Sequence, residues 1–527
     1  MRFSRRFMDR GQRSSSLLKH LMSFQPRAVT KADRSGTLSD YAASNILSIA
    51  FDVRAQGWSF GGHVREYAPR QYTFSDAAHL LRRAGFAGPT SEVEALQKLG
   101  PNLAVERLLY ASTDDNTIDN PFDVRALFLE RQAGSKANID PKAGLSGWWV
   151  HRLAHSSQPL KEKLVLFWHG HFATELQKVD NPFAMQQQNE LFRQKGLGRF
   201  ADLMLEVAKN PAMLRYLDNN RNVKGKPNEN FARELVELFT IGVHGGYTEH
   251  DVQESARAFT GWTFQTGNRD KPEENDRFTN PTFVFNKKNF DGGEKTYLGQ
   301  SGKLTGEDIV RIVTAHPSTA KFIITKLWKF FVGDTISPND LAELTALWNS
   351  SGGEIAVLLR AIFKSEVFYA KANRHGLIKS PVEYAIGMLR SSSARLALEQ
   401  SLGIWGAMRV MGQTLFEPPN VKGWDGGSDW VSDTTLLNRL NLVGGVTQRR
   451  LPAQLRKDQA APPTVLTLPS GSSLQETIEL LGKTYLGEKP DGALLRAMQL
   501  YADGKNTPEV AKGLAYLVLA SPQYHLA

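Results

Sequence analysis

Two segments of the sequence carry side chains that could perform acid–base or metal chemistry. His169 and His171 stand on either side of one glycine, and Glu234 and Glu237 are three residues apart in a helical pattern. An imidazole can act as a general acid or base or bind a transition metal, whereas two carboxylates can bind a hard cation or exchange a proton. These four residues are therefore the candidate catalytic set, for a hydrolytic or metal-assisted reaction.

Helical spacing limits what the two histidines can do together. Side chains two residues apart on an α-helix point about 200° apart, so both imidazoles can meet one metal ion only if the helix breaks at Gly170. The apolar run from Leu164 to Trp168 predicts a buried helix, and we expect at most one of the pair to face a site. The alternative is that both are hydrogen-bonded histidines of the core.

The two glutamates belong to a stretch, residues 228–242, that places several polar groups on an apolar helical pattern. Glu234 and Glu237 can share a helix face with Asn230 and Arg233. One interpretation is an acid–base or metal site, and the other is a buried network that fixes the register of the helix. Metal sites in helical bundles use Glu-x-x-His, but Thr240 stands at that position here. A divalent metal is therefore compatible with these residues but not favoured, and the sequence leaves the identity of any cofactor open.

Further polar and aromatic residues are candidates for ligand binding. Asp218 and Asn228 border a basic loop over residues 221–226, which could order over an anion or be an ordinary solvated loop. Lys422 and Trp424 lie in a loop rich in proline and glycine, where a cation beside an aromatic ring suits a sugar or a peptide; the indole could equally fill the core. The candidate binding residues are Asp218, Asn228, Asn230, Arg233, Tyr247, Arg257, Trp262, Lys422 and Trp424.

The elements that must position these residues are predicted to be helices. A capping hydroxyl stands directly before a proline at Ser337, Ser380 and Thr507, which is typical of helix starts. Apolar residues recur at helical spacing elsewhere, for example over 322–331. We predict a mainly α fold: a large, bundle-like domain of many helices with irregular loops rich in proline, glycine and tryptophan.

One segment, residues 264–300, breaks this pattern and is rich in Asn, Asp, Lys and Gly. Two β-prone runs, Thr282–Phe285 and Lys295–Leu298, stand on either side of Asp291-Gly292-Gly293. A turn between two such runs is typical of a hairpin. We therefore predict a small β-hairpin excursion from the helical domain.

A chain of 527 residues is too long for one ordinary compact core. The formal charge of +10 is uneven, because residues 1–35 carry nine Lys or Arg against two Asp. Because most of the positive charge lies in this terminal segment and not along a groove of the folded part, we expect the folded part not to bind nucleic acid. The predicted organisation is a basic tail over 1–45, a main helical domain over 46–450, a Pro/Ser linker over 451–473, and a C-terminal helical cap over 474–527 that packs on the main domain.

Several features exclude common classes of protein. With no cysteine, the chain has no disulfide, thiolate nucleophile or thiolate-held metal. It lacks an apolar run of about 20 residues, which a membrane-spanning helix requires, and it lacks the motifs of serine hydrolases, P-loops, dinucleotide sites and EF-hands. Arg5-Arg6 resembles the start of a twin-arginine signal, but polar residues 9–14 follow it instead of an apolar region, so no signal peptide is predicted.

Several motifs together resemble the bacterial family called domain of unknown function 1800, over about residues 70–527. The motifs are Ala78–Phe86, Pro159–Lys163, Phe167–Thr174, Pro211–Asn219, the 228–242 stretch, Gly245–Thr248, Lys326–Trp328, Lys379–Glu383 and Pro418–Trp424. The resemblance implies no established reaction. Many relatives look exported, and their genes often stand beside those of a second family, domain of unknown function 1501, which resembles sulfatase-like enzymes and is the expected partner. Relatives often carry a His-Asp pair where this chain has Phe290-Asp291, so imidazole chemistry is not expected at that turn.

Two functions remain open. The favoured one is an accessory, partner-binding helical protein with a polar pocket, because the chain has many aromatic residues and proline-rich loops. The alternative is an enzyme of undescribed type, hydrolytic or metal-assisted, that uses His169 or His171 with Glu234 and Glu237. In both cases we expect residues 168–172 and the 228–242 stretch to pack together around the pocket.

Overall fold

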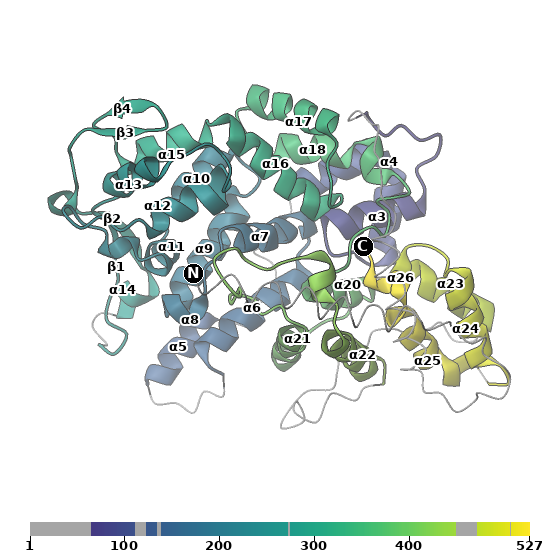
Figure 1. The fold of residues 1–527 in the computed structure, drawn as a ribbon. Coiled ribbons are helices and arrows are strands. Elements are labelled where there is room, and N and C mark those ends of the chain that lie inside the picture. Colours follow the sequence, from purple (N-terminus) through teal and green to yellow (C-terminus); the bar gives the residue numbers. More distant parts are fainter. Residues whose placement is uncertain (1–64, 111–122, 134–138, 272–274, 449–471, 506) are drawn as a thin grey trace, which may run out of the picture.

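The computed structural model describes residues 65–110, 123–133, 139–271, 275–448, 472–505 and 507–527. The predicted tail over 1–45 lies outside these ranges, as does the predicted linker over 451–473 except for its last two residues. The described chain is mainly helical with two small sheets, which confirms the predicted fold class (Figure 1). In the described residues, no helix combines the length and the apolar character needed to cross a membrane.

Helix α7 (Pro159–His171) runs through the centre of the molecule (Figure 1). Its neighbours include α3, α4, α6 and α9, and nearly all its residues are buried, the charged Glu162 and Lys163 among them. The helices of this part are α3 (Phe74–Ala84), α4 (Thr90–Tyr110), α5 (Val124–Gln132), α6 (Pro141–His155), α8 (Leu176–Val179), α9 (Pro182–Lys195), α10 (Phe200–Lys209) and α11 (Pro211–Tyr216).

The second half of the chain supplies further helices, of which α16 and α20 contact α7 through Phe330 and Glu383. Ser337 and Ser380 accept hydrogen bonds from Asp340 N and Glu383 N, which confirms the two predicted caps. The helices are α15 (Gly306–Thr314), α16 (Pro317–Phe331), α17 (Pro338–Ser351), α18 (Ile355–Phe363), α19 (Glu366–Tyr369), α20 (Pro381–Ser391), α21 (Leu398–Val410) and α22 (Asp433–Gln448), with a 3₁₀ turn η6 (Gly427–Trp430).

The β structure differs from the predicted hairpin. The strand β2 (Thr282–Phe285) pairs antiparallel with β1 (Trp262–Gln265), and β3 (Lys295–Tyr297) pairs with β4 (Gln300–Gly302). The two predicted runs therefore do not pair with each other. The strand β2 pairs with β1, which precedes it in the sequence, and α14 (Asn275–Thr279) lies in the connection between them. The strand β3 pairs instead with β4, because the chain turns at Leu298-Gly299.

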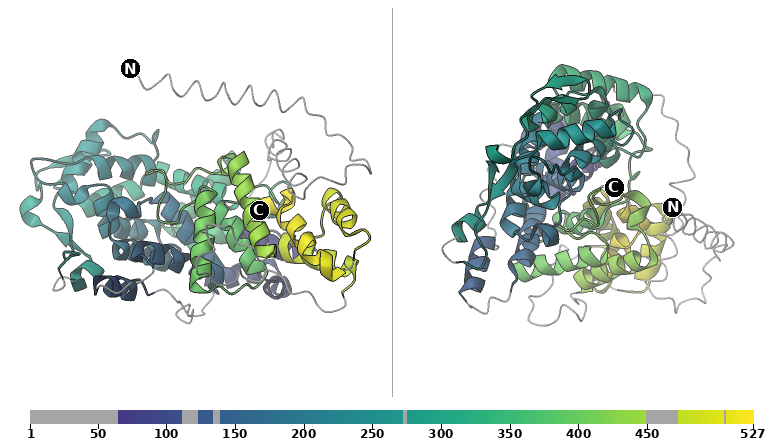
Figure 2. Two further views of the ribbon diagram at one scale, coloured as in Figure 1. Left: turned by 90° about the horizontal axis from the view of Figure 1, so that it is seen from below. Right: turned by 60° about the vertical axis from the view of Figure 1, so that its left-hand side comes forward.

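The C-terminal helices lie at the end of the molecule opposite the two sheets (Figures 1 and 2). Tyr524 donates a hydrogen bond to the Tyr384 carbonyl at 2.9 Å, and the Tyr384 hydroxyl donates to the Leu519 carbonyl at 2.8 Å. These bonds join this end to α20. The elements are α23 (Leu474–Leu481), the π-helix η8 (Gly482–Leu486), α24 (Gly492–Ala502), α25 (Thr507–Leu519) and α26 (Pro522–His525).

Candidate functional site

The 228–242 stretch forms the short helix α12 (Asn230–Glu234), which continues as the π-helix η3 (Leu235–Thr240). The amide of Ile241 bonds to the Val236 carbonyl five residues back, the Thr240 hydroxyl bonds to the Leu235 carbonyl at 2.5 Å, and Gly242 ends the helix with φ 84°. A wide helical turn of this kind is often found at functional sites. Here it leaves its last carbonyls to accept hydrogen bonds from side chains.

His171 and Lys326 donate hydrogen bonds to these carbonyls. His171 donates from Nε2 to the Phe239 carbonyl at 3.0 Å, which leaves Nδ1 to accept from Lys326 Nζ at 3.1 Å. Lys326 Nζ also donates to the Leu238 carbonyl at 3.3 Å. Burial lowers the pKa of Lys326 to about 8, and burial together with the Lys326 charge holds the pKa of His171 well below its ordinary value. The end of α7 and the 228–242 stretch thus meet through one imidazole and one amine.

His169 lies in a different environment from His171. Its ring is enclosed by Trp149, Phe416 and Trp424, with ring centroids 5.4 to 5.6 Å away. Its Nε2 has no hydrogen-bond partner among the described residues, and burial lowers its pKa to about 3. This imidazole is neutral at physiological pH and packs as an aromatic side chain of the core.

Glu237 belongs to an ion-pair network centred on Arg233. The guanidinium of Arg233 lies 2.7 Å from Glu249, 3.1 Å from Glu229 and 3.4 Å from Glu237. Tyr247 also bonds to Glu237; burial, then this bond, raises the pKa of the phenol to about 12. One cation is therefore shared among three carboxylates on a half-exposed face.

Glu234 does not share these contacts. Its side chain is half-buried, and burial and the neighbouring Glu237 charge raise the pKa of its carboxyl, while Arg233 and Lys422 act in the opposite direction. The electrostatic interaction with Lys422 connects the 228–242 stretch to the loop over residues 420–427. Neither glutamate is hydrogen-bonded to His169 or His171 in the described part of the chain.

The remaining predicted binding residues have partners within the protein. Asp218 pairs with Lys178 at 3.1 Å. The Asn228 side chain accepts from Asn230 N at 3.0 Å, and Asn230 in turn donates to the Leu217 carbonyl at 3.2 Å. Trp262 is buried in β1 beneath Lys209. These contacts order the polypeptide around α12 and β1.

Arg257 has two carboxylate partners close to the two sheets. It lies 2.7 Å from Glu254 and 2.9 Å from Asp291. The carboxylate of Asp291 also accepts from Gly293 N at 3.0 Å. Asp291 therefore stabilises the turn over residues 291–293 and connects it to Arg257.

A cleft of about 390 Å³ opens beside the His171–Lys326 pair, and we call it the central cleft. It lies between α7, α16, the start of α20 and residues 422–430. Its walls are aromatic and apolar, and its polar groups carry both signs of charge. The lining residues are Leu166, Phe167, Gly170, His171, Lys326, Lys329, Phe330, Asp334, Leu377, Ile378, Ser380, Glu383, Gln413, Lys422, Trp424, Asp425, Gly426, Gly427, Asp429 and Trp430.

The loop that carries Lys422 and Trp424 rests directly on α7. Gly423 has φ +85°, and a Cβ atom built on it would lie 2.1 Å from the Gly170 carbonyl oxygen. Only glycine allows both the backbone conformation and the close approach. The contact of these two glycines places Trp424 beside Gly170 and on the wall of the central cleft.

Three of the residues that line the central cleft are predicted site residues. His171, Lys422 and Trp424 were candidates and line it, whereas Lys326 and Glu383 were not candidates. A signal was present, because Lys326–Trp328 and Lys379–Glu383 are among the motifs that carry the family resemblance. Four such motifs, far apart in the sequence, contribute to the walls of this one cleft.

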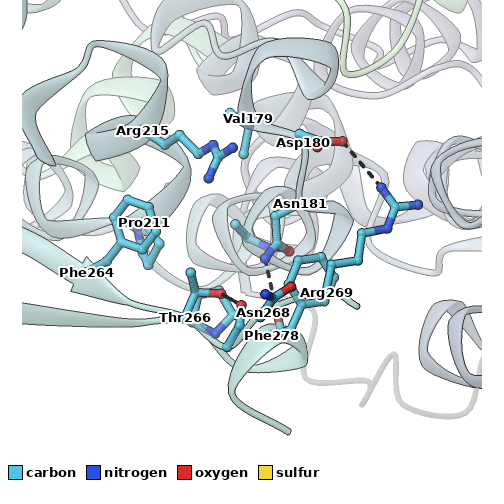
Figure 3. A pocket seen from close by; sticks show the side chains of 13 residues that line it. Val179, Asp180, Asn181, Pro211, Arg215, Phe264, Thr266, Asn268, Arg269 and Phe278 are labelled. Carbon is cyan, nitrogen blue, oxygen red and sulfur yellow. Dashed lines mark hydrogen bonds and ion pairs between the residues drawn. The ribbon is translucent and has the colours of Figure 1, made fainter. Parts of the chain in front are cut away.

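A second, smaller hollow of about 240 Å³ lies between α9, α11 and the segment that follows β1 (Figure 3). Asp180 pairs there with Lys142 at 2.8 Å and Arg269 at 3.7 Å, and Asn181 donates to the Phe278 carbonyl at 3.1 Å. Its lining includes none of the candidate residues. The central cleft is therefore the better candidate for the functional site.

The described residues contain no group of three His, Cys, Asp or Glu side chains placed to hold a metal ion. Comparison with curated proteins and with solved structures gave no match. Residues 79–526, nearly the whole chain, match the family described as Protein of unknown function (DUF1800). This chain therefore belongs to that family.

Proposed function

We propose that this protein is an accessory protein that binds a partner protein, and that the central cleft receives an extended segment of that partner. The observation that carries the proposal is the convergence of four separate family motifs on one open cleft with aromatic walls. A few residues supply most of the binding energy of a protein interface, and aromatic side chains such as Trp are enriched among them. Trp424 and Phe330 provide such surfaces, and both are only partly buried.

The charges around the cleft favour a polypeptide over a uniformly charged ligand. Lys329 and Lys422 are exposed beside Asp425 and Asp429, so the rim offers both signs of charge within one opening. Complementary charges of this kind set the register and the specificity of a bound chain. The partner we propose is the companion protein of the domain of unknown function 1501 family, because its genes often stand beside those of this family.

The hydrolytic or metal-assisted alternative receives less support from the contacts. His171 uses both ring nitrogens within the fold, and Glu237 shares Arg233 with two other carboxylates. His169 faces aromatic rings. A catalytic role for these groups would require them to leave these partners.

The test is calorimetric titration of the full chain with a protein of the companion family. Trp424→Ala and Lys422→Glu should each weaken binding, Trp424→Ala by about 10-fold or more because it removes a central aromatic anchor. Lys288→Glu, which changes an exposed charge in the 3₁₀ turn after β2, is the matched control and should bind as the wild type does. Equal affinity for all four proteins, or no binding by the wild type, would overturn the proposal.

A further inference from the structure

Lys326 is a partly buried amine that lines the central cleft and is held in a fixed position. It lies on α16, and its ammonium group contacts the His171 ring, the Leu238 carbonyl and the face of Phe322, whose centroid is 4.8 Å away. All three partners are neutral. Across the described residues, no carboxylate lies within ion-pair distance of Lys326 Nζ.

A buried ammonium group with neutral partners is poorly stabilised in its charged form. Burial accordingly lowers the pKa of Lys326 to about 8, so a sizeable fraction of the amine is neutral near physiological pH. An exposed lysine has a pKa of about 10.4 and is almost fully protonated there. Desolvated lysines of this kind are the ones that proteins use as nucleophiles.

The contacts also orient the amine. Two of its N–H bonds are directed at His171 Nδ1 and the Leu238 carbonyl, so loss of the third proton leaves a lone pair at the remaining position. His171 can only accept at Nδ1, because its Nε2 proton is donated to Phe239. The histidine therefore holds the amine in place and acts as a positioning residue.

We propose that Lys326 is a nucleophilic amine of the central cleft and forms a reversible imine with a ligand that carries an aldehyde or keto group. The amine nitrogen attacks the carbonyl carbon and gives a carbinolamine. The nitrogen then loses its second proton while the carbon loses its hydroxyl group, so that one water molecule leaves and a C=N bond remains. No oxidation or reduction takes place, and hydrolysis releases the ligand. This chemistry is independent of the proposed binding of a partner protein.

Other charged groups in the central cleft can influence the pH dependence of labelling at Lys326. The charged groups that share the cleft with Lys326 are Lys329, Asp334, Glu383, Lys422, Asp425 and Asp429. The carboxyl of Glu383 is held by Lys163. Lys329 stands one turn of α16 further along and is exposed, so it is a matched internal control on the same helix.

The experiment uses the full chain with butanal as a neutral probe and glyoxylate as an anionic probe, followed by borohydride reduction and peptide mapping by mass spectrometry. At pH 8 the reduced label should accumulate on Lys326 about tenfold or more faster than on Lys329, because far more of the buried amine is neutral. The rate at Lys326 should rise with pH to a midpoint near 8. Similar rates at the two lysines would overturn the proposal.

Three variants separate reactivity from folding. Lys326→Arg keeps a cation but removes the nucleophile and should lose the label, while Lys329→Arg should keep the label at Lys326. His171→Gln removes the ring acceptor, and it should shift the pH midpoint of labelling at Lys326 if the imidazole positions the amine. Circular dichroism of each variant confirms the fold. Labelling at Lys326 that is unchanged by His171→Gln in a folded protein would contradict the positioning role.

Discussion

Two lysines contact opposite ends of α7, Lys163 fully buried and Lys326 partly buried, and the fold stabilises them in different ways. Lys163 is almost fully buried and forms an ion pair with Glu383, whose carboxylate also accepts from Ser380 N at 2.8 Å. Lys326 meets the other end of the helix at His171 and has only neutral partners. Burial lowers the pKa of both lysines, but at Lys163 the Glu383 charge acts against that shift. A buried cation with a counter-charge fixes structure, whereas one without it is available for chemistry.

Removal of the paired lysine, Lys163, should have the largest effect on stability. Lys163→Met keeps the aliphatic stem but leaves the mostly buried Glu383 carboxylate without its cation, so we expect a loss of about 3 kcal/mol in the free energy of unfolding. Urea unfolding followed by circular dichroism measures this loss. Lys326→Met is the matched control and should change stability by only about 1 kcal/mol, because relief of a buried charge offsets the lost hydrogen bonds. Equal losses in the two variants would show that the two ends of α7 do not differ.

The contact between the 420–427 loop and α7 should have a second, intermediate effect on stability, at the end of α7 that contacts Lys326. Gly423→Ala forces a left-handed backbone on an L-residue and brings Cβ against the Gly170 carbonyl, so we expect a loss of about 2 kcal/mol. Because Trp424 moves with the loop, its fluorescence should change as well. Gly426→Ala, in the same loop with no atom within 4 Å of the added Cβ, is the control. If both variants behave alike, the contact between Gly170 and Gly423 does not position the loop.

The sequence predicted where helices begin better than it predicted which strands pair. The caps at Ser337 and Ser380 were visible because a capping hydroxyl and the proline after it act within one turn. The pairing of β2 with β1 was missed, because a strand partner 17 to 23 residues away is selected by tertiary packing and not by local pattern. Local signals therefore determined the predicted fold class but not the β topology.

The candidate site was predicted in part for the same reason. The angle of about 200° between residues two apart predicted that His169 and His171 face different surroundings, and the structure encloses one in aromatic rings and binds the other to Lys326. The motif Lys326–Trp328 marks Lys326 in the sequence, but no local pattern shows which groups its amine contacts. Those contacts depend on where the π-helix and α7 lie against α16, and only the assembled fold shows that.

The pH dependence of stability isolates the protonation of Lys326 itself. The folded protein loses this proton near pH 8, whereas the unfolded chain keeps it until about pH 10.4, so between these values the unfolded state binds more protons and the wild-type fold gains stability as pH rises. Lys326→Met lacks this gain. Urea midpoints measured from pH 7 to pH 10 should therefore move in favour of the wild type relative to Lys326→Met, while Lys329→Met, which removes an exposed amine, should run parallel to the wild type. Parallel curves for Lys326→Met would mean that the amine is stabilised as a cation after all, and that the two ends of α7 are alike in this respect.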